Sequence, residues 1–140
     1  NIGGTRMNLA QEQEFPKQIY KVNRAALIAY ANASGDQNPI HQNEEFAKSV
    51  GLPNVIAHGM FTMGVAATYL SEIAGSRAVT ELSAKFVKPV VVPAGVDVEI
   101  EISGKVLEIE GELARIELSV ICDGVKVLGN AKGAIKWQKN

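Results

Sequence analysis

Three residues in the segment from Tyr30 to Met60 could together transfer protons next to a carbonyl group. Asp36 precedes His41 by five residues on one loop, and Gly59 follows near the start of the longest uncharged stretch of the chain. A carboxylate and an imidazole can divide the proton work, and a free backbone N–H at a helix start can stabilise a developing oxyanion. The only two histidines of the chain both lie in this segment.

Each of these residues also has a simpler interpretation. An aspartate in a loop rich in glycine and proline is commonly a turn residue. A lone histidine is commonly a surface residue or a satisfied core residue, and a glycine that begins an apolar helix commonly serves packing. Their combination at one spacing is what favours chemistry over these alternatives.

The combination resembles the hydratase motif of the MaoC-like, or (R)-specific enoyl-thioester hydratase, family. The matching positions are Tyr30, Ala31, Ser34, Gly35, Asp36, Asn38, Pro39 and His41, followed by Ile56, Ala57, His58, Gly59 and Met60. The resemblance is close over about half the chain, from Ile19 to Pro93, and elsewhere extends only to the strand pattern. Within the family the chain looks most like the catalytic subunit of the β-hydroxyacyl-ACP dehydratases of mycolic-acid synthesis.

The resemblance implies that Asp36 and His41 are the catalytic pair of an acyl-thioester hydratase. Hydration of the conjugated double bond needs a base for water, an acid for C2 and a stabiliser for the thioester oxygen. We favour His41 as the base and Asp36 as the group that exchanges the C2 proton, although the sequence leaves this division open. The backbone N–H of Gly59 is expected to face the thioester oxygen.

Four further residues are candidates for substrate binding, namely Asn38, Pro39, His58 and Met60. From their own chemistry, Asn38 is expected to hold the loop by bonding the backbone, and His58 to cap the following helix. Some family members have a serine eight residues after the oxyanion glycine. Ala67 occupies that position here, so no hydroxyl supports Asp36 from that side.

Length and composition predict one domain spanning residues 1–140, with residues 1–6 as a tail. The net charge of −1 argues against nucleic acid as a partner. The single cysteine, Cys122, excludes an internal disulfide, fits a cytoplasmic protein and is expected to be a core thiol. The sequence contains no metal-ligand cluster, P-loop or dinucleotide fingerprint, so we expect neither a metal nor a cofactor.

Capping residues and hydrophobic spacing predict three helices. They are expected at 24–33, 44–50 and 58–74, bounded by Asn23, Gly35, Asn43, Gly51 and Gly75. The third is apolar on nearly every face, and residues 55–71 carry no charge. We interpret it as a buried helix rather than a membrane span, because the run is slightly short and contains His58 and threonines.

Period-two alternation predicts strands after this helix. Strands are expected at 79–86, 96–102, 114–120, 125–128 and 131–137, with an earlier one at 17–22 and a tight primed turn at Asp123-Gly124. One buried helix followed by an antiparallel meander indicates an α+β protein whose sheet wraps around a long central helix. The resemblance implies the same architecture, the hot-dog fold.

The function implied by the resemblance is reversible hydration of trans-2-enoyl thioesters to (3R)-hydroxyacyl thioesters in fatty-acid metabolism. The alternatives are a non-catalytic hot-dog partner subunit, an acyl-binding regulator or a hot-dog acyl thioesterase. Retention of Asp36 and His41 argues against a non-catalytic role. Chain length, carrier (CoA or acyl carrier protein) and physiological direction stay open.

The active protein is expected to be at least a dimer, either of identical chains or with a paralogous hot-dog subunit. A helix half wrapped by one sheet leaves apolar edges uncovered. Gly64 and Ala67 are small enough to let another surface approach the helix. No membrane partner is expected.

Overall fold

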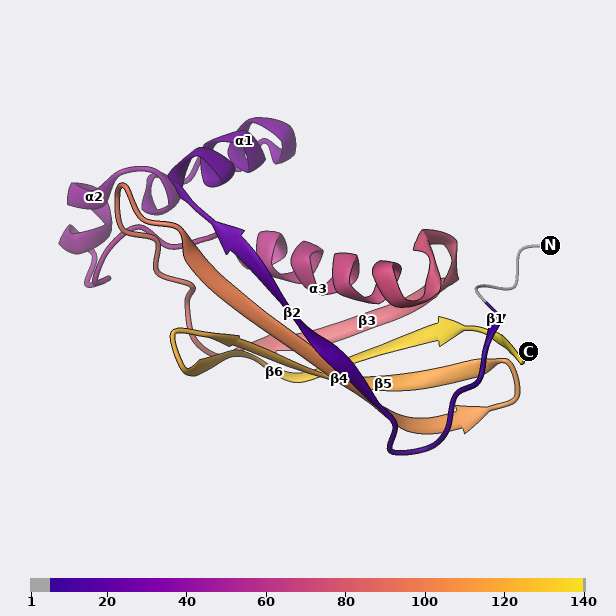
Figure 1. Cartoon of the computed structure of the whole chain (residues 1–140). Coiled ribbons are helices and arrows are strands. Elements are labelled where there is room, and N and C mark those ends of the chain that lie inside the picture. Colours follow the sequence, from indigo (N-terminus) through magenta and orange to yellow (C-terminus); the bar gives the residue numbers. More distant parts are fainter. Residues whose placement is uncertain (1–5, 140) are drawn as a thin grey trace.

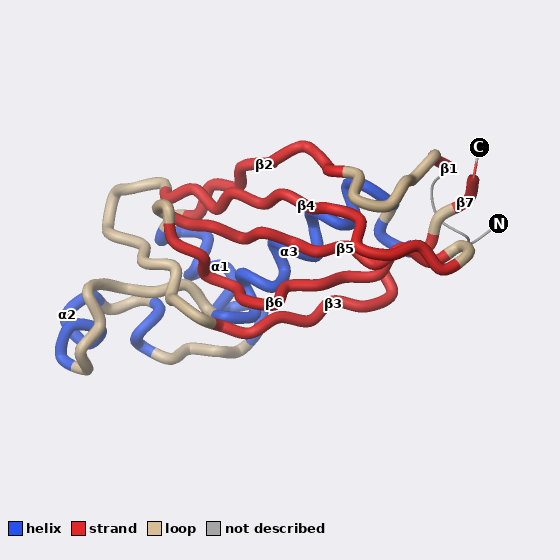
Figure 2. Tube along the Cα trace, turned by 90° about the horizontal axis from the view of Figure 1, so that it is seen from below, coloured by secondary structure: helices blue, strands red, loops and turns tan. Residues whose placement is uncertain are grey.

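The computed structural model describes residues 6–139 of the chain. Within them, a five-stranded antiparallel sheet in the order β2-β4-β5-β6-β3 carries the helix α3 across one face (Figure 1). From below, the strands lie side by side with α3 behind them (Figure 2). The strands are β2 (Glu14–Val22), β3 (Val79–Phe86), β4 (Val98–Glu110), β5 (Leu113–Cys122) and β6 (Val125–Lys136). This arrangement confirms the expected α+β architecture of a sheet around a central helix.

The local helix signals are confirmed. The side chain of Asn23 accepts a hydrogen bond from the Ala26 N–H at the start of α1 (Arg24–Ser34), and Gly35 ends that helix with a φ of 83°. In the same way Asn43 caps α2 (Glu44–Ser49). A short 3-10 helix, η1 (Pro39–His41), lies between them inside the predicted loop. A further 3-10 turn, η2 (Ser76–Ala78), connects the central helix to β3.

The central helix α3 (Gly59–Ala74) is buried on one side only. Its buried residues are Thr62, Ala66, Tyr69, Leu70 and Ala74. On the opposite side Met60 is 61% exposed, and no atom lies within 4 Å of a Cβ built at Gly64. The all-round apolar pattern therefore predicted more burial than a single chain provides. No helix among residues 6–139 is both long enough and apolar enough to cross a membrane.

The sequence pattern located the strands but not all of their limits. Strand β4 begins at Val98 rather than at Val96, after a turn in which Gly95 has a φ of 71°. The two strands expected at 125–128 and 131–137 are one strand, β6. Asn130 adopts a φ of 47°, and the pairing of β6 with β5 shifts register nearby, so the chain passes this point as a bulge.

The Asp123-Gly124 turn joins β5 to β6 as predicted. Its residues have φ angles of 57° and 74°, the pair of positive values that a primed hairpin turn requires. Cys122 is buried at the end of β5, as expected, and burial raises the pKa of its thiol.

The two ends of the described chain meet in a small parallel pair, β1 (Arg6–Met7) with β7 (Gln138–Lys139). Figure 1 shows both ends at the opposite end of the molecule from α1 and α2. The tail expected at 1–6 lies outside the described residues except for Arg6, which pairs with Gln138. The single domain spanning 1–140 stays a prediction.

We predict that Gly133→Ala will destabilise the fold, because Leu70 of α3 packs directly against β6 there. A Cβ atom at Gly133 would collide with Cδ1 of the fully buried Leu70 and lie 3.3 Å from the Glu81 carbonyl oxygen. Urea denaturation should show a loss of about 1–3 kcal/mol in the free energy of unfolding. In Gly133→Ala/Leu70→Ala the two losses should be less than additive, and strict additivity would contradict this contact.

Candidate active site

The candidate site is organised around the extended segment that precedes α3. On one side of it, the Ala57 N–H donates to the Val90 carbonyl oxygen at 2.9 Å, and the Val92 N–H donates to Val55 at 2.8 Å. On the other side the Ile56 N–H donates to the carbonyl oxygen of Ile40 at 3.1 Å. The segment 55–59 thus joins the loop of Asp36 and His41 to the loop that follows β3.

The His41 side chain is buried, at 8% exposure, and held in one orientation. Its Nδ1 lies 2.7 Å from the carbonyl oxygen of Ile56. A carbonyl can only accept, so Nδ1 carries the proton and Nε2 keeps a lone pair in the neutral ring. That Nε2 lies 3.9 Å from Oδ2 of Asp36, whose side chain is 51% exposed. The gap is too long for a direct hydrogen bond and is compatible with one bridging water.

Asp36 also makes the local bonds of a turn residue. Its Oδ1 accepts from the Asn38 N–H at 3.1 Å, and its own N–H donates to Oγ of Ser34 at 3.2 Å. Asn38 in turn accepts from the Ile40 N–H at 3.2 Å, which confirms its expected role in holding the loop. The turn interpretation and the site interpretation of Asp36 are therefore compatible, since Oδ1 holds the turn while Oδ2 faces His41.

The expected capping role of His58 is wrong. The His58 side chain makes no cap hydrogen bond to α3. Instead Nε2 donates to the carbonyl oxygen of Asp36 at 3.1 Å, and the ring stacks on His41 with centroids 3.8 Å apart. The ring is 2% exposed, with Tyr30 at a centroid distance of 4.8 Å. Sequence spacing could not foresee this orientation, because it depends on contacts across 22 residues.

Gly59 is the first residue of α3, so its N–H has no acceptor within the helix. It lines a cavity of about 370 Å³ together with His41 and Thr62. The other lining residues are Ile56, Ala57, Phe86, Val87, Lys88, Pro89, Val90 and Val127. His41 and Gly59 therefore line one largely apolar hollow, whereas Asp36 is not among its lining residues.

Phe86 is a cavity residue that the sequence analysis did not identify. Its ring atoms lie 3.0–3.3 Å from the position of a Cβ atom at Gly59, and the residue is 58% exposed. The alternating pattern placed Phe86 on a strand. Nothing in that pattern pointed to the start of a helix 27 positions earlier in the sequence.

None of the four predicted substrate-binding residues lines this cavity. Pro39 begins η1, and Met60 is exposed on the open side of α3; neither is among the cavity-lining residues. Their roles in substrate binding, like those of Asn38 and His58, stay predictions.

Asp36, His41 and His58 could in principle offer ligands to a metal, since one such atom from each lies within 4.8 Å of the others. Metal ligands must direct their lone pairs at one point. The two imidazoles are stacked with an interplanar angle of 23° and centroids 3.8 Å apart, so their in-plane lone pairs lie in two nearly parallel planes and converge poorly on one point. The geometry is therefore better suited to proton transfer than to metal binding.

Arg24, at the start of α1, braces the loops around the site. Its guanidinium donates to the Val92 carbonyl oxygen at 2.6 Å, to Asn54 at 2.8 Å and to Glu44 at 3.2 Å. These partners come from the loop after β3, the segment before α3 and helix α2. One partly buried cation therefore ties together the elements that carry the site.

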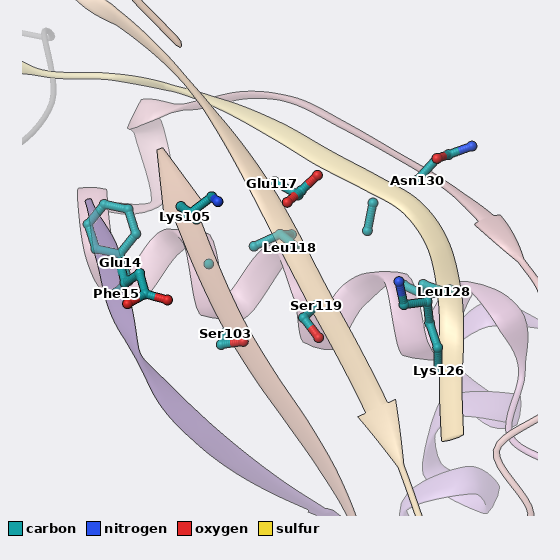
Figure 3. Close-up of a pocket in the computed structure, with 12 residues that line it drawn as sticks. Glu14, Phe15, Ser103, Lys105, Glu117, Leu118, Ser119, Lys126, Leu128 and Asn130 are labelled. Atoms are coloured by element: carbon teal, nitrogen blue, oxygen red, sulfur yellow. The ribbon is translucent and has the colours of Figure 1, made fainter. Parts of the chain in front are cut away.

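A second concavity, of about 350 Å³, lies over the strands of the sheet with α3 behind them (Figure 3). Polar side chains such as Ser103, Lys105, Glu117 and Ser119 line it. Lys105 and Glu117 face each other across β4 and β5, and Lys105 also pairs with Glu12 at 3.1 Å. This hollow contains neither histidine and none of the predicted site residues.

Comparisons with known proteins agree with the motif. The sequence model of the MaoC like domain matches residues 7–121. The 3-hydroxyacyl-thioester dehydratase X of Mycobacterium tuberculosis is 44% identical over 80 residues, or 56% of this chain and 28% of that protein. The 3-hydroxybutyryl-CoA dehydratase of Methylorubrum extorquens is 29% identical over 85% of this chain and 75% of that protein.

A solved structure described as a MaoC-like dehydratase superposes with a TM-score of 0.92 at 33% identity, over 97% of this chain and 43% of that chain. The hot-dog fold is thereby confirmed. The chain spans less than half the length of this protein and of dehydratase X.

We predict opposite tautomers for the two histidines. When both imidazoles are uncharged, His41 should carry its proton on Nδ1 and His58 should carry its proton on Nε2. Each of these nitrogens faces a backbone carbonyl oxygen. Long-range ¹H–¹⁵N correlation spectra in mildly alkaline buffer measure this directly. A His41 ring protonated on Nε2 would contradict the hydrogen bond to Ile56.

Proposed function

The chain belongs to the MaoC-like family, and from this premise we propose that it catalyses reversible hydration of trans-2-enoyl thioesters to (3R)-hydroxyacyl thioesters in fatty-acid metabolism. One observation carries the proposal. Nε2 of His41 and Oδ2 of Asp36 lie 3.9 Å apart, and His41 and Gly59 line one largely apolar cavity. The (3R) configuration rests on the family resemblance alone.

The proposed mechanism gives Asp36, His41 and the Gly59 N–H complementary roles. A water held between Asp36 and His41 gives a proton to Nε2 of His41 while its oxygen bonds to C3 of the substrate. The electrons of the double bond move toward the thioester oxygen, whose charge the Gly59 N–H stabilises. The proton taken by His41 returns through Asp36 to C2, so both groups end in their starting states. Dehydration follows the same path in reverse.

The geometry supports His41 rather than Asp36 as the base for water. Burial and the bond to Ile56 fix the His41 ring before substrate arrives, so its lone pair needs no reorientation. The Asp36 side chain is half exposed, which leaves its carboxylate free to reach C2. The carrier, either CoA or acyl carrier protein, would approach from outside the cavity, in the cytoplasm.

The proposal is tested with purified protein and crotonyl-CoA. Loss of the enoyl-thioester absorbance reports hydration, release of free thiol reports hydrolysis, and chiral analysis identifies the product. We expect (3R)-hydroxybutyryl-CoA without thiol release. Thiol release would indicate a thioesterase, a mainly (3S) product would reject the family mechanism, and no reaction would favour a partner subunit or acyl-binding regulator.

We predict that Asp36→Asn and His41→Ala will each lower the hydration rate by at least about 10², the scale of a general acid or base. Both variants should keep a native far-UV spectrum, because neither residue belongs to the core under α3. Ser119→Ala, in the hollow outside the site, serves as the matched control and should retain full turnover. Near wild-type rates in either site variant would remove that residue from the mechanism.

We predict that Gly59→Val will lower kcat by about 10²–10³, the value of one oxyanion donor, and that Gly59→Ala will be milder. The loss should appear in kcat at least as much as in KM, because the charge on the thioester oxygen is greatest in the transition state. Steady-state kinetics and far-UV spectra measure both effects.

Phe86 supplies the control for this experiment, because any side chain at Gly59 meets its ring. If Gly59 serves only packing against that ring, Gly59→Ala/Phe86→Ala should turn over as fast as Phe86→Ala. If the substrate needs the space, the double variant should stay slower. A lower melting temperature with unchanged turnover of the folded fraction would remove the oxyanion role.

We further propose that the active assembly is at least a dimer, formed with an identical chain or a paralogous hot-dog subunit. The open side of α3 exposes Met60 and Gly64, and edge strand β3 ends at the exposed Phe86, which the exposed Val87 follows. Light scattering at micromolar concentration should give the mass of a dimer or a larger assembly, and a stable monomer with hydratase activity would contradict this proposal. Gly64→Leu, at a position where an added Cβ atom meets nothing beyond its own helix backbone, should shift the assembly toward monomer if this face is the interface.

A further inference from the structure

His58 is a buried histidine that the proposed mechanism does not use. We propose that it is a positioning residue, which holds Asp36 and His41 in register with each other and with Gly59. The inference rests on the proposed function, and it replaces the predicted role of His58 in substrate binding with a positioning role.

The first contact places the aspartate. The Nε2–H of His58 donates to the backbone carbonyl oxygen of Asp36 at 3.1 Å. His58 precedes Gly59 directly in the chain, so this bond sets the distance between the carboxylate loop and the start of α3. The other hydrogen bonds of Asp36 itself are local. Its N–H donates to Ser34, and its carboxylate accepts from the Asn38 N–H.

The second contact places the base. The hydrogen bond from Nδ1 of His41 to Ile56 fixes one edge of the imidazole but permits the ring to swing about that bond. The ring of His58 lies 3.8 Å from His41 in a stacked arrangement, which closes one face against such motion. Edge and face together aim Nε2 toward Oδ2 of Asp36.

The surroundings of His58 argue against direct contact with substrate. The residue is 2% exposed and is not among the residues that line the cavity. Its ring also meets Tyr30, which in turn packs edge-on against Phe61 at 5.5 Å. His58 is therefore enclosed between the base and an aromatic pair.

The unpartnered nitrogen of His58 supports a positioning role over a packing role. Nδ1 is buried and makes no hydrogen bond within the described residues 6–139. An unsatisfied buried acceptor destabilises the folded state, and a packed apolar ring would avoid that cost. The feature that a histidine adds at this position is the hydrogen bond from Nε2 to the carbonyl oxygen of Asp36.

The test compares His58→Phe with His58→Gln under the crotonyl-CoA assay. Phenylalanine keeps a ring that can stack on His41 but removes the donor, whereas glutamine keeps a donor and removes the ring. We expect His58→Phe to lower kcat by about 10²-fold, the effect of a misplacement near 1 Å, with KM changed less than about twofold. His58→Gln should retain more of the wild-type kcat than His58→Phe.

Two further readouts separate positioning from folding. Turnover is expressed per folded molecule from the melting curve, and long-range ¹H–¹⁵N spectra report the His41 ring. A kcat for His58→Phe equal to wild type, or a lower melting temperature as its only effect, overturns the proposal. Equal losses in His58→Phe and His58→Gln overturn the donor role.

Asp36→Asn and His41→Ala, measured beside them, keep the two hypotheses apart. If these variants are slow while His58→Phe is fast, only the positioning role fails. If they turn over normally, the proposed function fails first, and with it the role of His58.

Discussion

The extended segment before α3 is the constraint on which the rest of the site depends. Its backbone is hydrogen bonded to residues 90–92 on one side and to Ile40 on the other. It then continues directly into the helix at Gly59. Five consecutive residues, 55–59, therefore carry the carbonyl that orients His41, the ring that stacks on it and the glycine that lines the cavity. Any shift of this segment would move all three together.

The sheet supplies the rigidity that such a segment needs. Helix α3 approaches β6 so closely that residue 133 has no room for a side chain against Leu70. Close packing of this kind resists small displacements, because interiors have few voids into which atoms can move. This contact fixes the C-terminal half of α3 against β6, while the hydrogen-bonded segment before Gly59 holds the start of the helix. The opposite face of the helix stays open, with Met60 exposed, which is why a partner surface is part of the proposed assembly.

Burial gives the two residues of the proposed catalytic pair different surroundings. His41 is enclosed and held at both its edge and its face, as its proposed role as the base requires. Asp36 keeps one oxygen in a local turn, and its side chain as a whole is half exposed. A fixed base beside a more accessible carboxylate suits a reaction in which one group holds water and the other meets the substrate.

The sequence by itself determined the parts of this protein that depend on neighbours along the chain. Asn23 and Asn43 marked helix starts, Asp123-Gly124 marked a primed turn, and period-two alternation located the strands, because caps and pleats are local. The motif also brought Asp36, His41 and Gly59 together by resemblance. Only the tertiary structure decided how His58 is oriented, that residues 125–136 form one bulged strand and that Phe86 covers Gly59. These features are contacts between residues distant in sequence, and no local propensity specifies which ring will meet which carbonyl once the sheet has closed on α3.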